Sequence, residues 1–343
     1  MAPDDRSDHR SISRRGLATG AVSAAGLSLF GVRGSSVRAD TIGSPEPGAT
    51  PGATPGATPD AAGGTPTNEP KILVRVEYVG GFVAPETNLT LTPTYQLTDD
   101  GREISQGVQI LIYPPPALPS LQAATLTGTG IDAILDAART AGLADSDREY
   151  INPNVTDLPN QVITVTTDGR TVVTTTYGLD QLDPADTTEL AAARDRLQPF
   201  LSLLATPPSL RANGQVAAPE TSYEFSDLQI VAVPANELPA AGEQSTLEGV
   251  TPTGPVAWPL VTPLSDFGIA LSDAIGGEGY AGTFPGARVD TVSGANLETI
   301  LPLAQQANQL TIWRSNDEEW VLLLRPLLPG EVGNLARLAS EDD

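Results

Sequence analysis

One short stretch of this sequence occurs twice, and this recurrence restricts what the chain can fold into. Residues 125–141 align with residues 291–307, with an offset of 166 positions between Thr127 and Ser293. Each copy has a short apolar run, a hydroxyl residue suited to cap a helix, and aliphatic residues spaced along one helix face. A recurring strand and helix predict two related α+β units in tandem. The match can also arise without duplication, because many capped amphipathic helices share this pattern.

The remaining pattern is that of antiparallel hairpins. Two runs rich in β-branched residues flank Asp168-Gly169, a dipeptide that supplies the positive φ angles of a tight turn. Similar runs flank Asp99-Asp100-Gly101 and Asn316-Asp317. We therefore predict an α+β fold with mainly antiparallel sheets and a few packed helices. The expected helices cover about 128–141, 187–204 and 294–308. The expected strands cover about 71–79, 88–98, 103–112, 161–167, 170–177, 224–233, 256–260, 310–314 and 319–325.

Composition divides the chain into five segments. The second of them contains Gly-Ala-Thr-Pro three times in tandem and offers nothing apolar to bury, so it is expected to be a disordered linker. It is either a passive spacer or a glycosylated stalk. The segments are a signal peptide at 1–39, the linker at 40–70, a first α+β unit at 71–205, a connector at 206–222 and a second α+β unit at 223–343.

Residues 1–39 have the three parts of a signal peptide. A polar region ends in the pair Arg14-Arg15, a weakly apolar run follows, and small residues precede the expected cleavage after Ala39. The arginine pair is similar to the twin-arginine signal, whose pathway exports folded proteins. The alternative is an ordinary secretory signal. The apolar run is too short and too interrupted for a membrane span, and no later stretch is long enough, so no transmembrane segment is expected in the mature chain.

Charge and residue types exclude several chemistries. The formal net charge is −23, which repels phosphate backbones, so nucleic acid is not an expected partner. There is no cysteine, and the single histidine, His9, lies in the expected signal peptide. The mature protein would then lack imidazole and thiol groups. That excludes Ser-His-Asp and Cys-His catalysis and His- or Cys-bound metals. No cofactor and no metal are expected.

Carboxylates are the remaining candidates for catalysis. A glycosidase needs one carboxylic acid with a raised pKa and one ionised partner. The sequence cannot pair its candidates, which are Glu77, Glu103, Asp132, Asp157 and Glu224.

Other motifs carry weaker signals. Gly277-Glu-Gly279-Tyr-Ala-Gly282 matches a dinucleotide-binding pattern but lacks the helix start that phosphate binding needs, so a loop is expected. Lys71, the only lysine, starts a strand and is expected to be structural. Exposed aspartates could bind calcium, although no EF-hand spacing occurs; these pairs are Asp99/Asp100 and Asp145/Asp147. Trp313 and Trp320 are expected in the core or at a sheet edge rather than in a ligand platform.

Three stretches carry a family resemblance: residues 75–82, residues 112–119, and the segments 313–315 and 325–331 taken together. On these, the chain resembles a group of uncharacterised exported proteins from high-GC bacteria, over most of 71–331. The resemblance implies an envelope location and no chemistry. Members often carry cysteines toward the C-terminus, and this sequence has none.

The function expected from the sequence is that of an exported cell-envelope or extracellular protein. It would bind a partner or ligand in the envelope or outside the cell without catalysis. The alternative is a carboxylate-dependent hydrolase that acts on wall or extracellular glycan. A buried, closely spaced Asp/Glu pair in a cleft would favour the hydrolase.

Overall fold

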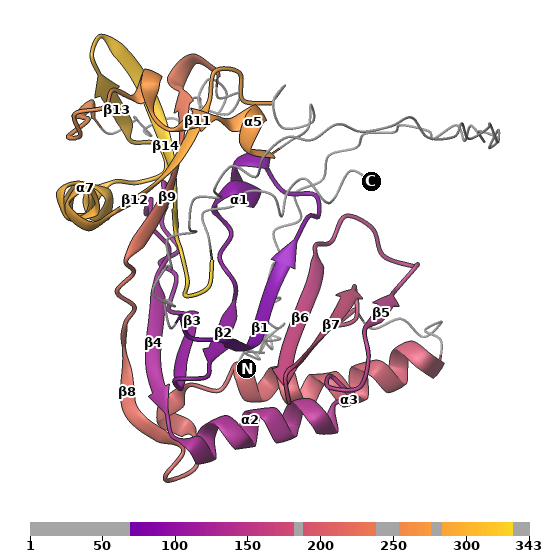
Figure 1. The fold of residues 1–343 in the computed structure, drawn as a ribbon. Coiled ribbons are helices and arrows are strands. Elements are labelled where there is room, and N and C mark those ends of the chain that lie inside the picture. Colours follow the sequence, from indigo (N-terminus) through magenta and orange to yellow (C-terminus); the bar gives the residue numbers. More distant parts are fainter. Residues whose placement is uncertain (1–68, 182–187, 238–253, 276–282, 332–343) are drawn as a thin grey trace, which may run out of the picture. The chain divides into compact units, whose positions relative to one another are not determined.

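A computed structural model describes residues 69–181, 188–237, 254–275 and 283–331 (Figure 1). Arg14, Arg15, Ala39, the linker repeats and the glycine-rich motif at 277–282 lie outside these residues.

The first sheet contains eight strands and is antiparallel except for one edge pair, β5 with β7. Its helices α2 (Gly128–Thr140) and α3 (Thr188–Leu204) lie along one face (Figure 1). The strand order is β5 (Arg148–Ile151), β7 (Arg170–Tyr177), β6 (Asn160–Thr167), β1 (Ile72–Val79), β2 (Tyr95–Thr98), β3 (Arg102–Gln106), β4 (Leu121–Leu126) and β8 (Val216–Ser222).

The second sheet contains six strands, again antiparallel except for one pair, β10 with β13. Its strand order is β10 (Val256–Ala257), β13 (Ile312–Ser315), β14 (Glu318–Pro326), β9 (Asp227–Pro234), β12 (Arg288–Ser293) and β11 (Ile269–Ala270). The remaining helical elements are α1 (Pro85–Thr90), α5 (Leu271–Ile275), α7 (Gly294–Gln306), η1 (Pro208–Leu210), η2 (Ala235–Glu237) and η3 (Leu264–Asp266).

The predicted α+β class is confirmed, and so are the three hairpins. Asp168 and Gly169 both have positive φ angles, 54° and 75°, between the paired strands β6 and β7. Asn316 likewise has φ 55° between β13 and β14. Hairpin turns were predictable because positive φ angles select Gly, Asn and Asp over other residues.

Two predicted strands are partly wrong. Residues 85–90 of the region before β2 form helix α1, which begins at a proline, and strand pairing starts only at Tyr95. Proline suits the first helical position because an N–H group there would have no acceptor within the helix, so its absence costs nothing. Strand β3 ends at Gln106, so residues 107–112 lie outside the sheet.

The predicted connector 206–222 contains strand β8, which pairs with β4 of the first sheet.

The sequence recurrence is limited to one strand and one helix. Strand β4 precedes α2 as β12 precedes α7, but the hairpins that follow dock differently. In the first sheet, the first strand of the hairpin, β6, pairs with the rest of the sheet through β1. In the second sheet, the second strand of the hairpin, β14, pairs with the rest of the sheet through β9. The prediction that the hairpins would superpose with the helices is therefore wrong.

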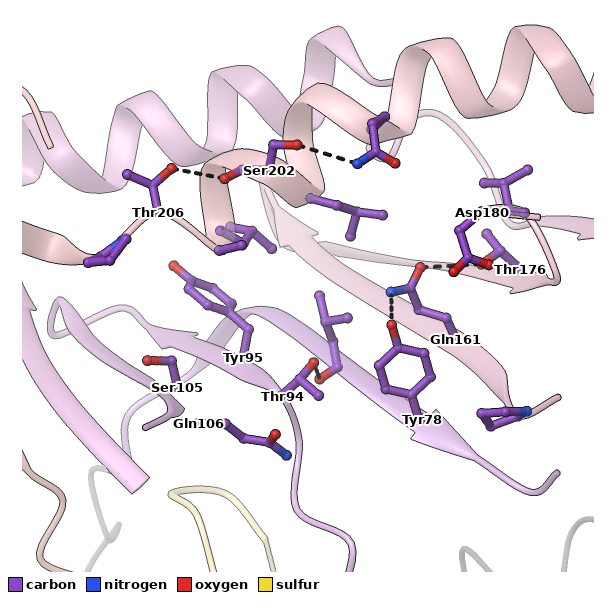
Figure 2. A pocket seen from close by; sticks show the side chains of 18 of the residues that line it. Tyr78, Thr94, Tyr95, Ser105, Gln106, Gln161, Thr176, Asp180, Ser202 and Thr206 are labelled. Atoms are coloured by element: carbon purple, nitrogen blue, oxygen red, sulfur yellow. Dashed lines mark hydrogen bonds between the residues drawn. The ribbon is translucent and has the colours of Figure 1, made fainter. Parts of the chain in front are cut away.

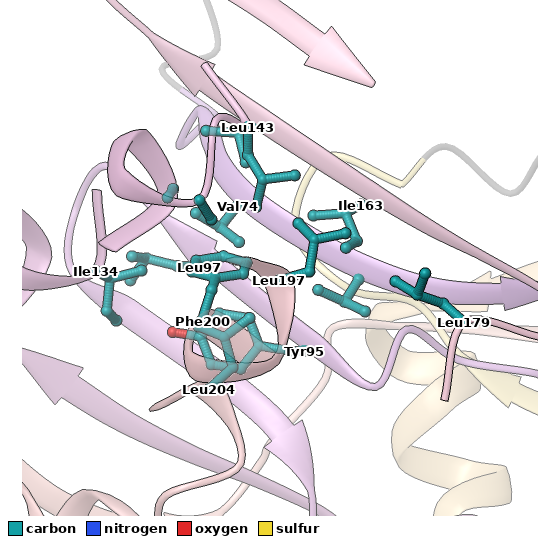
Figure 3. Packing of buried hydrophobic residues seen from close by; sticks show 14 of the residues in the cluster. Val74, Tyr95, Leu97, Ile134, Leu143, Ile163, Leu179, Leu197, Phe200 and Leu204 are labelled. Carbon is teal, nitrogen blue, oxygen red and sulfur yellow. The ribbon is translucent and has the colours of Figure 1, made fainter. Parts of the chain in front are cut away.

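The first core fills the space between the first sheet and helices α2 and α3 (Figure 3). Val74, Leu97 and Ile163 project from the sheet, and Ile134 and Phe200 meet them from the helices. All five are at most 1% exposed. The second core contains Trp258, Phe267 and Trp313, which contact one another edge to face at centroid distances of 5.6 and 6.3 Å.

Helix α2 is fixed at its start by Thr127. Its Oγ1 accepts a hydrogen bond from Gly130 N at 3.2 Å and donates one to Gly214 O at 2.6 Å. Gly130 lies so close to the next segment that an added Cβ would be 2.2 Å from Gln215 O. A side chain at this position would push the helix away from the backbone beside it.

We expect Gly130→Ala to lower the free energy of unfolding by about 1–3 kcal/mol, because overpacking displaces backbone. Gly128→Ala is the matched control in the same helix, since nothing lies within 4 Å of its Cβ position. It should leave stability unchanged or raise it by up to about 1 kcal/mol through helix propensity. Urea unfolding of both variants measures the difference. Equal effects would contradict the close approach at Gly130.

The end of the described chain packs on the first sheet. Leu328, which follows β14, is buried with Ile104 and Leu121 of that sheet. Gln96 Nε2 of β2 donates a hydrogen bond to Pro329 O at 2.8 Å. The two sheets therefore share a contact formed by residues after β14. None of the helices among the described residues is both long and apolar enough to cross a membrane.

Candidate functional site

A pocket of about 690 Å³ lies between the first sheet and the C-terminal end of α3. Its floor includes residues from β1, β2, β3, β6 and β7, and its opposite wall includes Ser202 and Thr206 (Figure 2). Strand alternation explains the floor, because residues opposite one another in neighbouring strands point to the same face. Ser202 and Thr206 extend from the helix end, where Thr206 Oγ1 donates to Ser202 O at 2.9 Å.

One side of the pocket holds a row of hydrogen-bonded side chains across three strands. Tyr78, Gln161 and Thr176 are direct cross-strand neighbours on β1, β6 and β7. Gln161 Nε2 donates to the Tyr78 hydroxyl at 2.9 Å, and Thr176 Oγ1 donates to Gln161 Oε1 at 3.3 Å. Because the Tyr78 oxygen accepts a bond here, its own proton can point into the pocket.

Asp180 places a carboxylate beside this row (Figure 2). Burial raises the pKa of Tyr78, the negative charge of Asp180 raises it further, and the hydrogen bond from Gln161 opposes them. Tyr78 therefore keeps its proton at neutral pH. The pocket thus offers a hydroxyl donor next to a carboxylate acceptor.

The other side contains a buried ion pair. Glu103 of β3 accepts a hydrogen bond from Arg211, and the two side chains are only 3% and 2% exposed. Burial raises the pKa of Glu103, more than the nearby Arg211 and Tyr95 lower it, and Glu220 adds to the rise. The second carboxylate oxygen of Glu103 has no hydrogen-bond partner among the described residues.

Tyr95 adjoins this ion pair. Burial, together with the charge of Glu103, raises the pKa of Tyr95 well above its ordinary value, although Arg211 opposes the shift. Its buried hydroxyl lies beside both members of the ion pair, and its interactions with Glu103 and Arg211 contribute to this shift.

The charged residues that line the pocket are Glu103, Asp180 and Glu220, all carboxylates. Glu103 and Glu220 come from β3 and β8, which are separated by β4. Strands lie about 4.8 Å apart, so the two backbones are separated by roughly 10 Å. The remaining polar lining consists of hydroxyls and amides, which donate and accept hydrogen bonds.

Of the five predicted catalytic candidates, only Glu103 lines the pocket. Glu77 pairs with Arg75 at 3.0 Å, and Asp157 has φ 65° in a turn. Asp132 and Glu224 are exposed. The sequence missed Tyr78, Gln161, Asp180 and Glu220. Period-two alternation within the β6–β7 hairpin could have placed Gln161 and Thr176 on one face, but nothing local indicates which helix covers it.

The other predicted candidates lie in structural settings. The main chain N–H of Lys71 donates to Asp99 Oδ1 at 2.9 Å, as part of the β1–β2 edge. Burial raises the pKa of Asp100, but hydrogen bonds from Thr98 and the Arg102 amide outweigh it and leave the pKa lowered.

Asp147 Oδ1 accepts a hydrogen bond from Val173 N at 2.9 Å. Asp145, which was paired with Asp147 as a possible calcium ligand, lies near Gly142. Within the described ranges, no three Asp, Glu, His or Cys side chains gather closely enough to hold a metal ion. Trp313 and Trp320 are 1% and 5% exposed, which confirms that they pack in the core.

Comparisons with protein-family models, with curated proteins and with solved structures gave no match.

Proposed function

We propose that this protein is exported and binds a hydroxyl-rich ligand without negative charge, such as a neutral carbohydrate, in the pocket beside α3. The observation that carries the proposal is the donor–acceptor pair of Tyr78 and Asp180 within a polar pocket. Neighbouring sugar hydroxyls can accept from one group and donate to the other. The volume, about 690 Å³, lies within the usual range for small-molecule sites.

Charge narrows the ligand class. The charged groups that line the pocket among the described residues are carboxylates, so an anionic ligand would meet repulsion. Tyr78 and Tyr95 supply aromatic surface beside the polar groups, as an amphipathic sugar ring requires. The location is proposed from residues 1–39, with Arg14 and Arg15 as the targeting pair. Cleavage after Ala39 gives a native protein that starts at Asp40, which N-terminal sequencing reads directly.

A glycan panel tests ligand binding. We expect the wild-type protein to bind one or more soluble neutral oligosaccharides, measured by calorimetry or by glycan array. Ser202→Trp places a large side chain in the pocket from an exposed helix position, so it should weaken binding at least tenfold. Ala192→Trp is the matched control, because it is exposed on the same helix and does not line the pocket. Equal loss in both variants, or no binding by wild type, would contradict the proposal.

The second candidate is a carboxylate-dependent glycan hydrolase, favoured by the raised pKa of Glu103 within the pocket. A general acid in a glycosidase needs such a shift and a second carboxylate across the substrate. Glu220 and Asp180 are the available partners. Against catalysis, Glu103 is tied to Arg211 and almost wholly buried. The same panel decides: release of shortened glycan during incubation favours the hydrolase, and unchanged bound glycan favours the binding protein.

A further inference from the structure

The loop between β3 and β4 exposes a continuous run of large apolar side chains. Val108 is 86% exposed, Ile110 61%, Leu111 98%, Ile112 57% and Tyr113 48%. Elsewhere on the described surface, large exposed apolar residues occur singly or in pairs. Such runs are rare on protein surfaces because they leave apolar area in water, and they mark contact sites.

The amide side chain within this run is turned inward. Gln109 Nε2 donates to the carbonyl oxygens of Gly107 and Ser120, at 3.1 and 3.0 Å, and its Oε1 accepts from Ser120 N. The amide group is therefore used at the loop base. What remains exposed at the tip is four aliphatic side chains and the ring of Tyr113.

The loop is held at both ends. At its base, Gly107 N donates to Ser120 O at 2.9 Å. Beyond the tip, Ala117 N donates to Ala307 O at 3.0 Å, and Pro116 forms an isolated β-bridge with Asn308, which lies between α7 and β13. Hydrogen bonds at both ends of the loop therefore hold the apolar tip in position.

Charge is absent around the tip. Residues 104–131 contain no Asp, Glu, Lys or Arg, in a chain in which 18% of residues are charged. Burying this loop in an apolar medium would therefore require no charged side chain of its own to leave water, which is the largest cost of such a transfer.

From these features we propose that residues 108–113 contact lipid: the loop inserts shallowly into the surface of a zwitterionic bilayer. The composition favours lipid over a protein partner, because Val, Leu and Ile partition into hydrocarbon. Protein hot spots instead use Trp, Tyr and Arg, and under-represent Leu and Val. Insertion is shallow because residues 108–113 lie outside every named helix and strand of the described chain, and irregular backbone cannot enter the hydrocarbon core.

The lipid charge follows from the charge of the protein. A net charge of −23 repels anionic headgroups, so the proposed surface is zwitterionic. Four aliphatic side chains together raise partition by roughly ten- to fiftyfold, which makes the contact reversible. The loop would then help to hold an exported protein at a membrane without crossing it.

Vesicle flotation with the full chain tests the proposal. Phosphatidylcholine vesicles should carry wild-type protein, and the double substitution Ile110→Asp/Leu111→Asp should lower the bound fraction at least tenfold. Val261→Asp is the matched control, because Val261 is an apolar residue that is 102% exposed on another loop. Residues 1–39 are present in every sample, so the contribution of the loop is read from the ratio of variant to wild type. Added phosphatidylglycerol should weaken binding at low salt, and salt should restore it.

Three results would overturn the proposal. Equal binding by wild type and the double variant would show that the loop does not contact lipid. A dimer that dissociates in the double variant, seen by light scattering without vesicles, would assign the loop to a second copy of the chain. If the double variant unfolds at lower urea concentration than Val261→Asp, the loop is covered by another part of the same chain.

Discussion

Replacing Glu331 by Gln is expected to lower the free energy of unfolding by about 3–5 kcal/mol, because it leaves the buried guanidinium group of Arg325 without a counter-charge. Glu331 Oε1 accepts from Arg325 at 2.6 Å and from Arg75, and Arg325 and Glu331 are 3% and 6% exposed. Its other oxygen accepts from Leu328 N at 2.9 Å. Urea unfolding at neutral pH measures the loss.

The matched control is Glu319→Gln. Glu319 also pairs with an arginine, Arg314, at 2.5 Å, but the two side chains are 48% and 51% exposed. Exposed pairs contribute at most about 1 kcal/mol. A loss in Glu331→Gln that is no larger than in Glu319→Gln would contradict the importance of burial.

The pH dependence of this contribution has a definite sign. Burial raises the pKa of Glu331, but Arg325, Arg75 and the Leu328 amide outweigh it, so the pKa is lowered. The unfolded chain therefore binds a proton at a higher pH than the fold does. The stabilisation is complete above the ordinary pKa of glutamate and is lost as the pH falls through the lowered value. Wild type and Glu331→Gln should accordingly converge in stability toward acid.

The second large effect is expected in the pocket. Arg211→Met should destabilise the fold by about 3–5 kcal/mol at neutral pH, because it leaves the Glu103 carboxylate buried without its partner. The loss should shrink as the pH falls through the raised pKa of Glu103 to the ordinary pKa of glutamate, below which Glu103 carries a proton in both states. Urea unfolding at several pH values measures this trend.

A double substitution separates lost charge pairing from lost packing. Glu103→Gln/Arg211→Met removes both charges and keeps similar volumes, so most of the stability should return. Replacing a buried ion pair by neutral groups is often close to neutral. If the double variant is as unstable as Arg211→Met alone, packing around Arg211 and not the unpaired carboxylate explains the loss.

Local patterns in this sequence predicted local structure well. The hairpins at Asp168-Gly169 and Asn316-Asp317 need residues that tolerate positive φ, and the helix at 188–204 shows its apolar spacing. The patterns failed where tertiary contacts decided. Residues 107–112 read as a strand because they are β-branched and apolar, yet they form an exposed loop.

The recurrence at 166 residues shows how far pattern alone can mislead. Thr127 caps α2 with its side chain, whereas Ser293 makes no such bond with α7. Gly294 opens α7 with φ 52°, a conformation that Gly128 does not share. Similar sequences thus give different N-terminal caps in α2 and α7, because capping depends on the residues that surround the first turn.

The pocket was less predictable than the fold. Glu103 could be named as a carboxylate, but its buried partner Arg211 is 108 residues away in the sequence. Its raised pKa depends on burial, which only the assembled sheet and helices create. Tyr78 and Gln161 are 83 residues apart, so no local spacing joins them.

Three separated stretches, residues 75–82, 112–119 and 325–331, contact segments that are distant in the sequence. Arg75 lies in the first stretch, and Arg325 and Glu331 lie in the last, within one buried network. The middle stretch supplies Pro116 and its bridge to Asn308.

The bond between Arg75 and Glu331 joins residues 256 positions apart. A chain leaving the ribosome therefore contains β1 long before Glu331, the distant partner of Arg75, has been translated. Contacts this distant slow folding, since a large loop must close before they form. The contacts of residues 328–331 with the first sheet can therefore form only after translation has passed residue 331.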